Sequence, residues 1–587
     1  MSKVAYLQQF EAEIKKLNTK WKKLQDTELE YSYTVPDVSL KQCFNYWTER
    51  HPEKPYIIFQ GKTYTYQECN KAARRIANGL NNLGYRKGDR LNTFIKNSPE
   101  FIMICQACFK LGIILVTNNP LDTPREFANK MKDSGAKIVV VDDTSIETMM
   151  TALKNTNMEK PDHIIYLNNE RKREYSFIHD KGIVDFKTML EYDNTELQVP
   201  VFPGDVQLLQ YTGGTTGISK GCCLTNKGLL SSAMALASYL KPSIKLQDLS
   251  VLLSLPMFHA YGLMIGVLIH MSTGGNTVLL ASQKPSVEEV LNAIEHYKPT
   301  CWPTVPVVLN SINKDDGLKN RNISSIRVIL CGSSLLPLET IETFSETYGI
   351  KIRECYGLSE AGILTGMPMK KAIAGSVGIP LPNTEVLVVD LETGTRVLAP
   401  GEPGEIIGRG PQLMKEYWNK PEETLNVIRN GWLYTGDIGI MDDEGKLKIV
   451  DRKKDLIIVS GFNVYPREIE EILYTHAEII EACTIGIPDE KRGEVPKAFI
   501  VKKKNSSITG EDIIRYCREY LSPYKVPRKI EFVDLIPKTK ASKPDRKAMK
   551  IWDQETKEVD ERVVDSPIPA VSIAIMPRAQ WGVRGKF

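Results

Sequence analysis

The feature that most constrains the fold is a repeated alternation of short strand-like apolar runs with helical ones. The first series is Tyr56–Phe59, Ala72–Leu83, Arg90–Ile95, Glu100–Leu111, Ile113–Val116, Pro124–Met131 and Lys137–Asp142. The second is Ser250–Leu255, Asn276–Leu280, Val287–His296, Ile326–Leu330, Pro337–Tyr348 and Lys351–Cys355. This order is typical of parallel sheets covered by helices, so we predict an α/β protein with two α/β subdomains.

The length of 587 residues exceeds what one hydrophobic core usually supports, so several domains are expected. From Glu385 onward, strand signals between glycine and proline turns predict a smaller β-rich subdomain. The charged segment Asp451–Asp455 is a candidate hinge before a compact α+β unit. The predicted division is a helical leader (1–38), a main domain (39–452), a small mobile C-terminal domain (453–552) and a tail (553–587).

The charge balance gives no reason to expect a nucleic-acid partner. The net charge of +4 is the small difference between 76 basic and 72 acidic residues. The 11 cysteines are scattered, and the first residues lack the apolar core of a signal peptide, which favours a reducing cytoplasm. Cys105 and Cys108 fall within a helical apolar pattern, so we expect two buried thiols rather than a redox or zinc site.

One segment, Leu249–His270, is long and apolar enough to resemble a membrane span. Pro256, Gly262 and Gly266 interrupt it, which favours a buried strand, a turn and a buried helix. We therefore predict no transmembrane segment, while peripheral contact with a membrane to collect a greasy substrate stays open. The sequence does not distinguish a monomer from a homodimer.

The stretch Tyr211–Gly221 is a candidate phosphate-binding loop. It follows the strand-like run Val206–Gln210, and Leu224–Asn226 is expected to open a helix after it. Glycines let backbone N–H groups turn toward an anion, hydroxyls add donors and a lysine adds charge. These groups are Gly213, Gly214 and Gly217, the hydroxyls of Thr212, Thr215 and Thr216, and Lys220. The spacing is not that of a Walker A loop, and a flexible surface turn is the alternative interpretation.

Three further motifs carry polar groups suited to a nucleotide. In Tyr356–Glu360 the aromatic ring can stack on a base and Glu360 can hold Mg²⁺. In Tyr434–Asp437 the Asp437 carboxylate can accept two ribose hydroxyls. Pro537–Lys543 presents a lysine on a loop. Taken singly, each motif has a structural alternative: a strand-end turn, a β-turn cap and a solvated lysine.

Taken together and in this order, the motifs resemble the adenylate-forming superfamily of acyl-CoA synthetases, acyl-adenylating domains and luciferases, over about Ser39 to Lys550. The stretches Asn119–Arg125, Leu209–Gly217, Asp451–Ile457 and Val459–Pro466 are most similar to long-chain fatty acyl-CoA ligases.

The resemblance implies a two-step reaction that uses ATP, Mg²⁺ and coenzyme A. A small-molecule carboxylic acid attacks the α-phosphate of ATP, and CoA captures the acyl adenylate. By the same match, Lys220 and the loop threonines face the phosphates, Thr216 and Glu360 hold the metal, and Lys543 bridges the carboxylate and the α-phosphate. The nucleotide site is completed by Gly332, Ser333, Tyr356, Gly357, Ser359, Asp437 and Arg452.

The thioester step implies a second set of residues. Lys454 would be the hinge of a rotating C-terminal domain, and Ser460, Gly461 and Phe462 would line the tunnel for the CoA thiol arm. His259 matches an aromatic gate, with a satisfied core histidine as its alternative. The acyl pocket would be lined by small or apolar groups near Tyr261–Gly262, Cys331–Gly332, Gly357 and Gly378–Ile379.

The lysine loop departs from the family pattern, because Ser542 and Pro544 flank Lys543 where glycine and an aliphatic residue are usual. The resemblance predicts an AMP-forming ligase for a hydrophobic acid, whether a medium- or long-chain fatty, alicyclic or aromatic one, that can also run in reverse. The alternatives are an adenylating enzyme with a non-CoA acceptor and a non-catalytic nucleotide-binding protein.

Overall fold

The computed structural model describes most of the chain. The described residues are 3–24, 32–167, 182–212, 219–282, 285–319, 321–332, 338–350, 352–369, 375–460, 462–539 and 544–564. The chain divides into two compact units, Met1–Leu456 and Ile457–Phe587. Within the described residues, the first unit contains three sheets and the second contains one.

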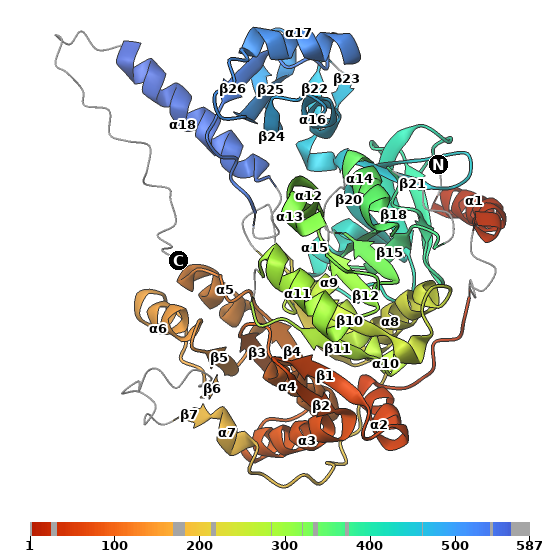
Figure 1. The fold of residues 1–587 in the computed structure, drawn as a ribbon, viewed down its shortest axis with the longest axis vertical. Coiled ribbons are helices and arrows are strands. Elements are labelled where there is room, and N and C mark those ends of the chain that lie inside the picture. Colours follow the sequence, from red (N-terminus) through yellow and green to blue (C-terminus); the bar gives the residue numbers. More distant parts are fainter. Residues whose placement is uncertain are drawn as a thin grey trace. The chain divides into compact units, whose positions relative to one another are not determined.

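The first sheet is parallel except at one edge (Figure 1). In the described chain its order is β7 (Ile183–Asp185), β6 (His163–Leu167), β5 (Ile138–Asp142), β3 (Arg90–Phe94), β4 (Ile114–Thr117), β8 (Val206–Tyr211) and β9 (Gly221–Thr225). All residues of β4 and β5 are buried, as expected for parallel strands that are covered on both faces. The same part of the chain forms α2 (Leu40–Arg50), α3 (Tyr66–Asn82), α4 (Pro99–Leu111), α5 (Pro124–Ser134), α6 (Ile146–Asn155), α7 (Phe186–Met189) and α8 (Asn226–Leu240).

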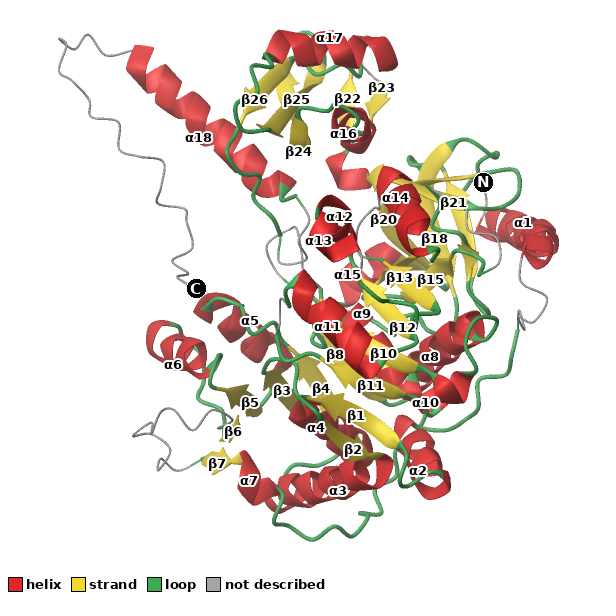
Figure 2. Ribbon diagram, in the orientation of Figure 1, coloured by secondary structure: helices red, strands yellow, loops and turns green. Residues whose placement is uncertain are grey.

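The second sheet has a parallel centre with antiparallel edges (Figure 2). Its order, among the strands that the structure describes, is β16 (Ile379–Pro380), β15 (Gly362–Gly366), β14 (Ile352–Leu358), β13 (Val328–Cys331), β12 (Cys301–Thr304), β10 (Ser250–Leu253), β11 (Asn276–Leu279), β1 (Pro55–Phe59) and β2 (Lys62–Thr65). Strand β1 comes early in the chain but pairs with β11, Ile57 opposite Thr277. The part of the chain that forms this second sheet also contains the helices α11 (Val287–Tyr297), α12 (Pro306–Lys314), α13 (Asp316–Lys319) and α14 (Leu338–Tyr348). The predicted α/β class is confirmed.

The apolar segment Leu249–His270 folds as predicted into a buried strand, a turn and helical structure. It contains β10, α9 (Ala260–Leu263), the π-helical turn Met264–Leu268 and the start of α10 (His270–Thr273). A side chain at Gly262 would lie 2.1 Å from the Pro256 carbonyl oxygen, so the turn requires glycine there. Among the described residues, no helix is both long and apolar enough to span a membrane.

The third sheet is antiparallel and matches the predicted β-rich subdomain. Its strands, as far as the chain is described, are β17 (Glu385–Val389), β18 (Pro403–Arg409), β20 (Trp432–Met441) and β19 (Ile428–Arg429), with β21 (Leu447–Arg452) beside β20. The predicted leader helix is α1 (Lys3–Leu24), which packs on this sheet, and α15 (Pro421–Val427) precedes β19.

The C-terminal unit is an α+β fold. Its described strands run in the order β23 (Phe462–Val464), β22 (Ile457–Val459), β25 (Gly493–Lys502) and β24 (Ile479–Asp489), with β26 (Lys529–Phe532) beside β25. Its helices are α16 (Pro466–Tyr474), α17 (Gly510–Tyr520) and α18 (Arg546–Val564). Helix α18 continues past Asp553, the expected start of the tail, because Asp553 is buried and pairs with Lys497 at 2.6 Å.

Strand β9 was not predicted. The helix α8 does begin at Asn226 with Thr225 as its N-cap, as expected, but the five residues before it form a strand antiparallel to β8. The run Gly-Cys-Cys-Leu-Thr is short and has no alternation, so its strand character comes from its neighbours. The expectation for Cys105 and Cys108 is confirmed, since both thiols are buried on α4 and burial raises the pKa of each.

Candidate active site

The glycine-rich stretch joins two paired strands. β8 and β9 pair up to Tyr211 and Gly221. Beyond them, the Thr212 amide donates to the Lys220 carbonyl at 2.9 Å, and the Ser219 hydroxyl donates to the Thr212 carbonyl. The two ends of the stretch are therefore held together as the foot of a hairpin. Five predicted phosphate-binding residues lie outside the described residues: Gly213, Gly214, Thr215, Thr216 and Gly217.

Lys220 lies at this foot between an aromatic ring and a carboxylate. Its ammonium nitrogen is 5.0 Å from the centre of the Tyr417 ring and forms an ion pair with Glu423 in the first turn of α15. The negative face of an aromatic ring attracts a cation. The Lys220 side chain is still 28% exposed, so its charge remains accessible to an anion in solvent.

Tyr417 reaches Lys220 because residues 415–418 extend the pairing of β9. The Trp418 amide donates to the Gly221 carbonyl at 2.8 Å, and the Cys223 amide donates to the Glu416 carbonyl at 2.9 Å. Tyr417 itself forms a bridge with Cys222. Sequence reasoning missed Tyr417, because no local pattern shows which distant segment will pair with β9.

Glu360 is joined to Lys220 through the same tyrosine. The Tyr417 hydroxyl donates to Glu360 Oε1 at 2.8 Å, and the Glu360 carbonyl accepts from the Met414 amide at 2.7 Å. Burial raises the pKa of the Glu360 carboxyl, while the bond from Tyr417 opposes that rise. The predicted metal-binding carboxylate and the predicted phosphate-binding lysine thus flank one aromatic side chain.

The residues expected to bind adenine and ribose contact one another directly. The Tyr356 hydroxyl donates to Asp437 Oδ2 at 2.7 Å, and Arg452 Nε lies 3.3 Å from Asp437 Oδ1. Asp437 and Arg452 are register partners on β20 and β21. Burial and the neighbouring Asp437 charge raise the pKa of Tyr356, which keeps its hydroxyl protonated as a donor. The Asp437 charge also raises the pKa of Glu360 and the Arg452 charge opposes this rise, so these groups lie near enough to interact electrostatically.

The remaining predicted nucleotide contacts lie at strand ends nearby. Gly332 follows β13, and its amide donates to the Thr304 carbonyl at 3.4 Å. Ser359 is partly exposed in the turn between β14 and β15. A side chain at Gly357 would lie 2.2 Å from the Gly362 carbonyl oxygen, so the two strands require glycine there. Ser333 lies outside the described residues.

His259 is the N-cap residue of α9 and is partly buried beside Phe258, with ring centres 4.9 Å apart. His270, by contrast, is a fully buried core histidine, and its Nε2 lies 2.8 Å from the Thr277 hydroxyl. Burial lowers the pKa of His270 to about 3, so it is neutral at physiological pH. His259, which is only partly buried, stays a gate candidate because of its position in the sequence.

The glycines assigned to the acyl pocket differ in whether backbone packing requires them. At Gly262, Gly357 and Gly378, an added Cβ would lie 2.0–2.2 Å from a backbone oxygen, so backbone packing alone requires glycine. At Gly332 the nearest atoms would be 3.5 Å away or more, at the Cys355 carbonyl and the Tyr261 ring, which is ordinary contact. Cys331 and Ile379, the other expected lining residues, are 1% and 4% exposed.

The thioester-step residues lie at and beyond the division between the units. Lys454 lies in a short 3₁₀ turn, Lys453–Asp455, directly before it. Ser460 has a left-handed backbone (φ +51°), and Phe462 is 56% exposed with its ring stacked on Tyr524 at 4.8 Å. Gly461 lies outside the described residues.

The lysine loop is closed at its base. Lys538 and Pro544 form an antiparallel bridge, and the Asp545 amide donates to the Pro537 carbonyl at 2.8 Å. Proline at position 544 therefore lies within a hairpin base. Lys543 itself and Ser542 lie outside the described residues.

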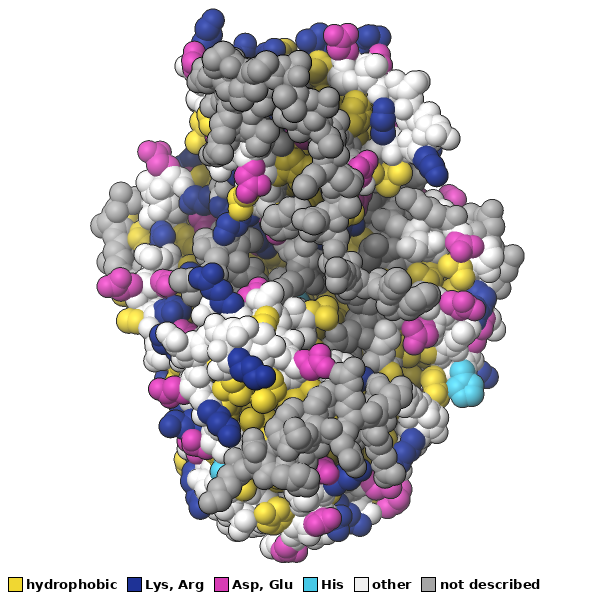
Figure 3. All heavy atoms as spheres, turned by 90° about the vertical axis from the view of Figure 1, so that its left-hand side faces the viewer, with side chains coloured by type: hydrophobic (Ala, Val, Ile, Leu, Met, Phe, Trp, Pro, Cys, Tyr) yellow, Lys and Arg dark blue, Asp and Glu magenta, His cyan; other side chains and the backbone are white. Residues whose placement is uncertain are grey.

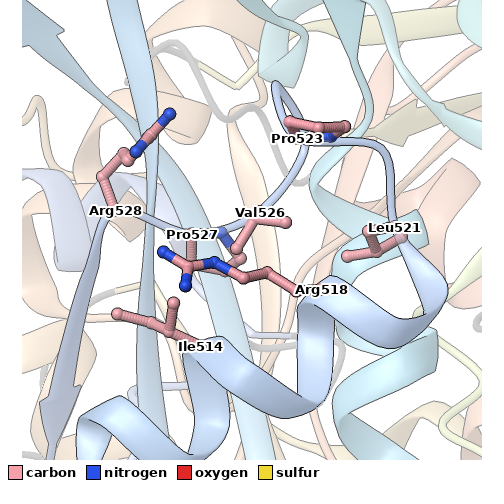
Figure 4. A pocket seen from close by; sticks show the side chains of 7 residues that line it. All are labelled: Ile514, Arg518, Leu521, Pro523, Val526, Pro527 and Arg528. Atoms are coloured by element: carbon pink, nitrogen blue, oxygen red, sulfur yellow. The ribbon is translucent and has the colours of Figure 1, made fainter.

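The C-terminal unit also contains a hollow of about 410 Å³ (Figure 4). Arg518 and Arg528 line it together with apolar side chains that include Leu521, Val526 and Pro527.

The fold and this site define a nucleotide-binding α/β enzyme with a separate C-terminal unit. The family pattern described as AMP-binding enzyme matches residues 44–418, and that of the AMP-binding enzyme C-terminal domain matches residues 468–543. The chain belongs to the AMP-binding enzyme family, and the predicted adenylate-forming resemblance is confirmed.

Two relatives span nearly the same length. The long-chain-fatty-acid–CoA ligase of Bacillus subtilis (strain 168) is 36% identical over 535 residues, which cover 88% of this chain and 95% of that protein. The long-chain-fatty-acid–CoA ligase of Yersinia pestis is 33% identical over 545 residues, with 88% and 95% covered.

Solved structures show the same fold. ATP-bound MatB from Rhodopseudomonas palustris is similar with a TM-score of 0.79 and 26% identity, over 87% of this chain and 98% of that one. The o-succinylbenzoate CoA synthetase of Bacillus subtilis, in complex with its acyl-adenylate intermediate, has a TM-score of 0.74 and 30% identity, over 88% and 98%.

Proposed function

We propose that this protein is an AMP-forming acyl-CoA synthetase whose acid is a long-chain fatty acid and whose chemistry is carried by the Lys220–Tyr417–Glu360 group. The class of reaction, ATP-dependent joining of a carboxylic acid to CoA through an acyl adenylate, agrees with the family and with the relatives. The enzyme uses ATP, Mg²⁺ and CoA. The observation that supports the residue assignment is that Lys220 and Glu360 both contact Tyr417 at the foot of the glycine-rich hairpin, with Asp437 and Arg452 near enough to act on the Glu360 charge.

In the first step, an oxygen of the acid forms a bond to the α-phosphorus of ATP and the bond to pyrophosphate breaks. Lys220 neutralises the phosphate charge that grows on the leaving group, together with the hydroxyl of Thr212 and the hydroxyls at positions 215 and 216. Lys543 would bridge the acid and the α-phosphate and hold the two anions in line.

Mg²⁺ fits this site as an ion shared with the substrate. Among the described residues, no cluster of three or more histidine, cysteine, aspartate or glutamate side chains could hold a metal. Mg²⁺ typically takes one or two carboxylates, substrate phosphates and water, which matches Glu360 with a hydroxyl at Thr216. When bound, the ion offsets triphosphate charge.

Asp437 and Arg452 orient the nucleotide. The carboxylate accepts the two ribose hydroxyls, and the Tyr356 hydroxyl and the Arg452 guanidinium fix its two oxygens. Gly332, Ser333, Gly357 and Ser359 would border the adenosine, and the Tyr356 ring would face adenine.

In the second step, the CoA sulfur forms a bond to the acyl carbon and AMP leaves. Ser460, Gly461 and Phe462 would line the path of the thiol arm, and His259 would gate it. Lys454 would be the hinge about which the C-terminal domain rotates, so that Lys543 leaves the site and the thiol path takes its place. A hinge needs only a few terminal residues that absorb a backbone change.

The long-chain fatty acid is proposed from the two ligases named for it. The expected lining groups near Tyr261, Cys331, Gly332 and Ile379 are small, aromatic or apolar, which suits a hydrocarbon acid. An aromatic acid is the second candidate, supported by the o-succinylbenzoate enzyme.

We place the enzyme in the cytoplasm, because all 11 cysteines are free thiols. Basic and acidic side chains are interspersed on the face shown in Figure 3, which supports the proposal of no nucleic-acid partner. Peripheral membrane contact fits a substrate that partitions into lipid, and a monomer and a homodimer remain equal proposals.

One assay tests the function. The protein is incubated with ATP, Mg²⁺ and acids of different chain length or aromatic character, with and without CoA, and AMP, pyrophosphate and thioester are measured. Thioester formation that is greatest with long-chain acids is the expected result. AMP turnover independent of CoA would indicate another acceptor, and no AMP with any acid would indicate a non-catalytic nucleotide-binding protein.

A further inference from the structure

Helix α1 lies outside the stretches that the family patterns match, yet it belongs to the compact first unit. Figure 1 shows it beside β18 and β21. Phe10, Ile14, Leu17 and Trp21 are each at most 4% exposed. Their spacing of three and four residues forms the apolar stripe of a helix with one buried face. Helix α1 is therefore a packed layer on the third sheet.

Two residues on the buried face of α1, Phe10 and Trp21, contact the two ends of the β20–β21 hairpin. Phe10 packs edge-on against Trp432, the first residue of β20, with ring centres 5.5 Å apart. The Trp21 indole N–H donates to the Gly445 carbonyl at 2.7 Å, in the turn that joins β20 to β21. The helix therefore holds the hairpin at both the start of β20 and the connecting turn.

The connecting turn is shaped to receive Trp21. Gly445 has a φ of +85°, and a side chain there would lie 2.7 Å from the indole nitrogen. The Lys20 ammonium donates to the Asp443 carbonyl at 2.6 Å. The Asp442 carboxylate accepts from two turn amides at 2.8 and 3.0 Å, which fixes the turn itself. The end of α1 that carries Lys20 and Trp21 and the turn between β20 and β21 thus match in shape and in hydrogen bonding.

An arginine ties the middle of the helix to the neighbouring strands. Arg409, at the end of β18, pairs with Glu11 of α1 at 2.7 Å and with Glu385 of β17. Its guanidinium carbon lies 4.6 Å from the centre of the Trp432 ring. One guanidinium thus bridges a carboxylate of α1 and a carboxylate of the sheet.

We propose that α1 is a brace that sets the position of the ribose-binding pair Asp437 and Arg452. Asp437 and Arg452 lie opposite each other on β20 and β21, within the hairpin that α1 contacts at both ends. Strand β21 leads directly into Lys453–Asp455. Trp21 is then a positioning residue that acts through the hairpin. This inference rests on the proposed role of Asp437 in binding ATP.

The physical reason is the narrow tolerance of a substrate-orienting contact. A displacement of about 1 Å in a positioning group, even far from the reacting atoms, can cost a large factor in rate. Hydrogen bonds from the hairpin to a ribose weaken when the hairpin shifts, whereas β8 and β9 belong to a different sheet from β20 and β21. The expected defect is therefore specific for ATP rather than for the acid or CoA.

The test compares full-length Trp21→Ala, Trp21→Phe and Asp437→Ala proteins with Lys22→Ala, an exposed change on the same helix. Trp21→Ala should raise the KM for ATP about tenfold and change the KM for CoA less than about twofold. Trp21→Phe keeps an aromatic ring in the buried site but loses the bond to Gly445 and part of the indole volume, so its defect should be smaller than that of Trp21→Ala. Hydrogen exchange should quicken in β20 and β21 and stay unchanged in β8.

The outcomes separate this inference from the site assignment. If Asp437→Ala leaves the KM for ATP unchanged, the ribose assignment fails whatever α1 does. If Asp437→Ala raises the KM for ATP but Trp21→Ala does not, the proposal that α1 is a brace is wrong. It is also wrong if Trp21→Ala changes the KM values for ATP, the acid and CoA equally. Lys22→Ala should match the wild type in every readout, and a defect there would also overturn the proposal. If Trp21→Ala does not fold, Trp21→Phe and Glu11→Gln supply the comparison.

Discussion

Replacing Tyr417 by phenylalanine isolates one hydroxyl of the site, because the ring beneath Lys220 remains. That hydroxyl donates to Glu360 Oε1 at 2.8 Å and opposes the rise in the Glu360 pKa that burial causes. The bond stabilises the ionised carboxylate, so its loss raises the pKa further. The variant should therefore bind the metal and ATP only at higher pH than the wild type.

The magnitude follows from the strength of the lost bond. A hydrogen bond to a charged group contributes about 1.5–3 kcal/mol, and one pKa unit corresponds to about 1.4 kcal/mol. The acidic limb of activity should move upward by about one to two pH units. The sign is fixed because the carboxylate must be ionised to hold a cation, so activity is lost as pH falls through the Glu360 pKa.

The assay is acid-dependent ATP–pyrophosphate exchange, measured as kcat/KM for ATP across pH at several Mg²⁺ concentrations. Higher Mg²⁺ should partly restore the variant, since the cation favours the ionised carboxylate. Tyr66→Phe is the matched control, because its buried hydroxyl donates to the Gly275 carbonyl at 2.7 Å in the core. An acidic limb that stays in place in Tyr417→Phe would refute the reasoning.

The other predictions concern charge and space around the same reaction. Lys543→Ala should abolish ATP–pyrophosphate exchange but leave CoA capture of a supplied acyl adenylate largely intact; equal loss in both assays would remove the lysine from its role. Gly461→Leu should spare exchange and block thioester formation, and unimpaired thioester would count against the tunnel. Glu423→Gln frees Lys220 from a partly exposed ion pair of about 0.2–1 kcal/mol, so the KM for ATP should fall by up to about fivefold, and a rise would show that Glu423 positions the lysine.

The order of strands and helices was readable from the sequence because burial leaves a local pattern. The run 138–142 is wholly apolar up to its final aspartate, and the structure buries it as a central parallel strand. The buried thiols of α4 and the folded-in segment Leu249–His270 follow from the same kind of signal. Hydrophobic periodicity is local, so it survives in a single sequence.

The contacts that build the site depend on pairing between distant segments. Tyr417 lies beside Lys220 only because its backbone pairs with Cys222 on β9. Neither segment has an alternation that would mark it as a strand, and nothing local selects its partner. The role of α1 is hidden for the same reason, since Trp21 meets a turn more than four hundred positions away.

Backbone packing at three of the glycines proposed for the acyl pocket limits how a new substrate range can be engineered. Enlarging Gly262, Gly357 or Gly378 would push strands and turns apart before it reshaped any cavity. Gly332 has space for a methyl group against Tyr261. Libraries aimed at shorter or bulkier acids would accordingly gain most by varying Tyr261 and Cys331 and by leaving the other three glycines untouched, whereas a change at Gly332 would also affect the proposed adenosine site.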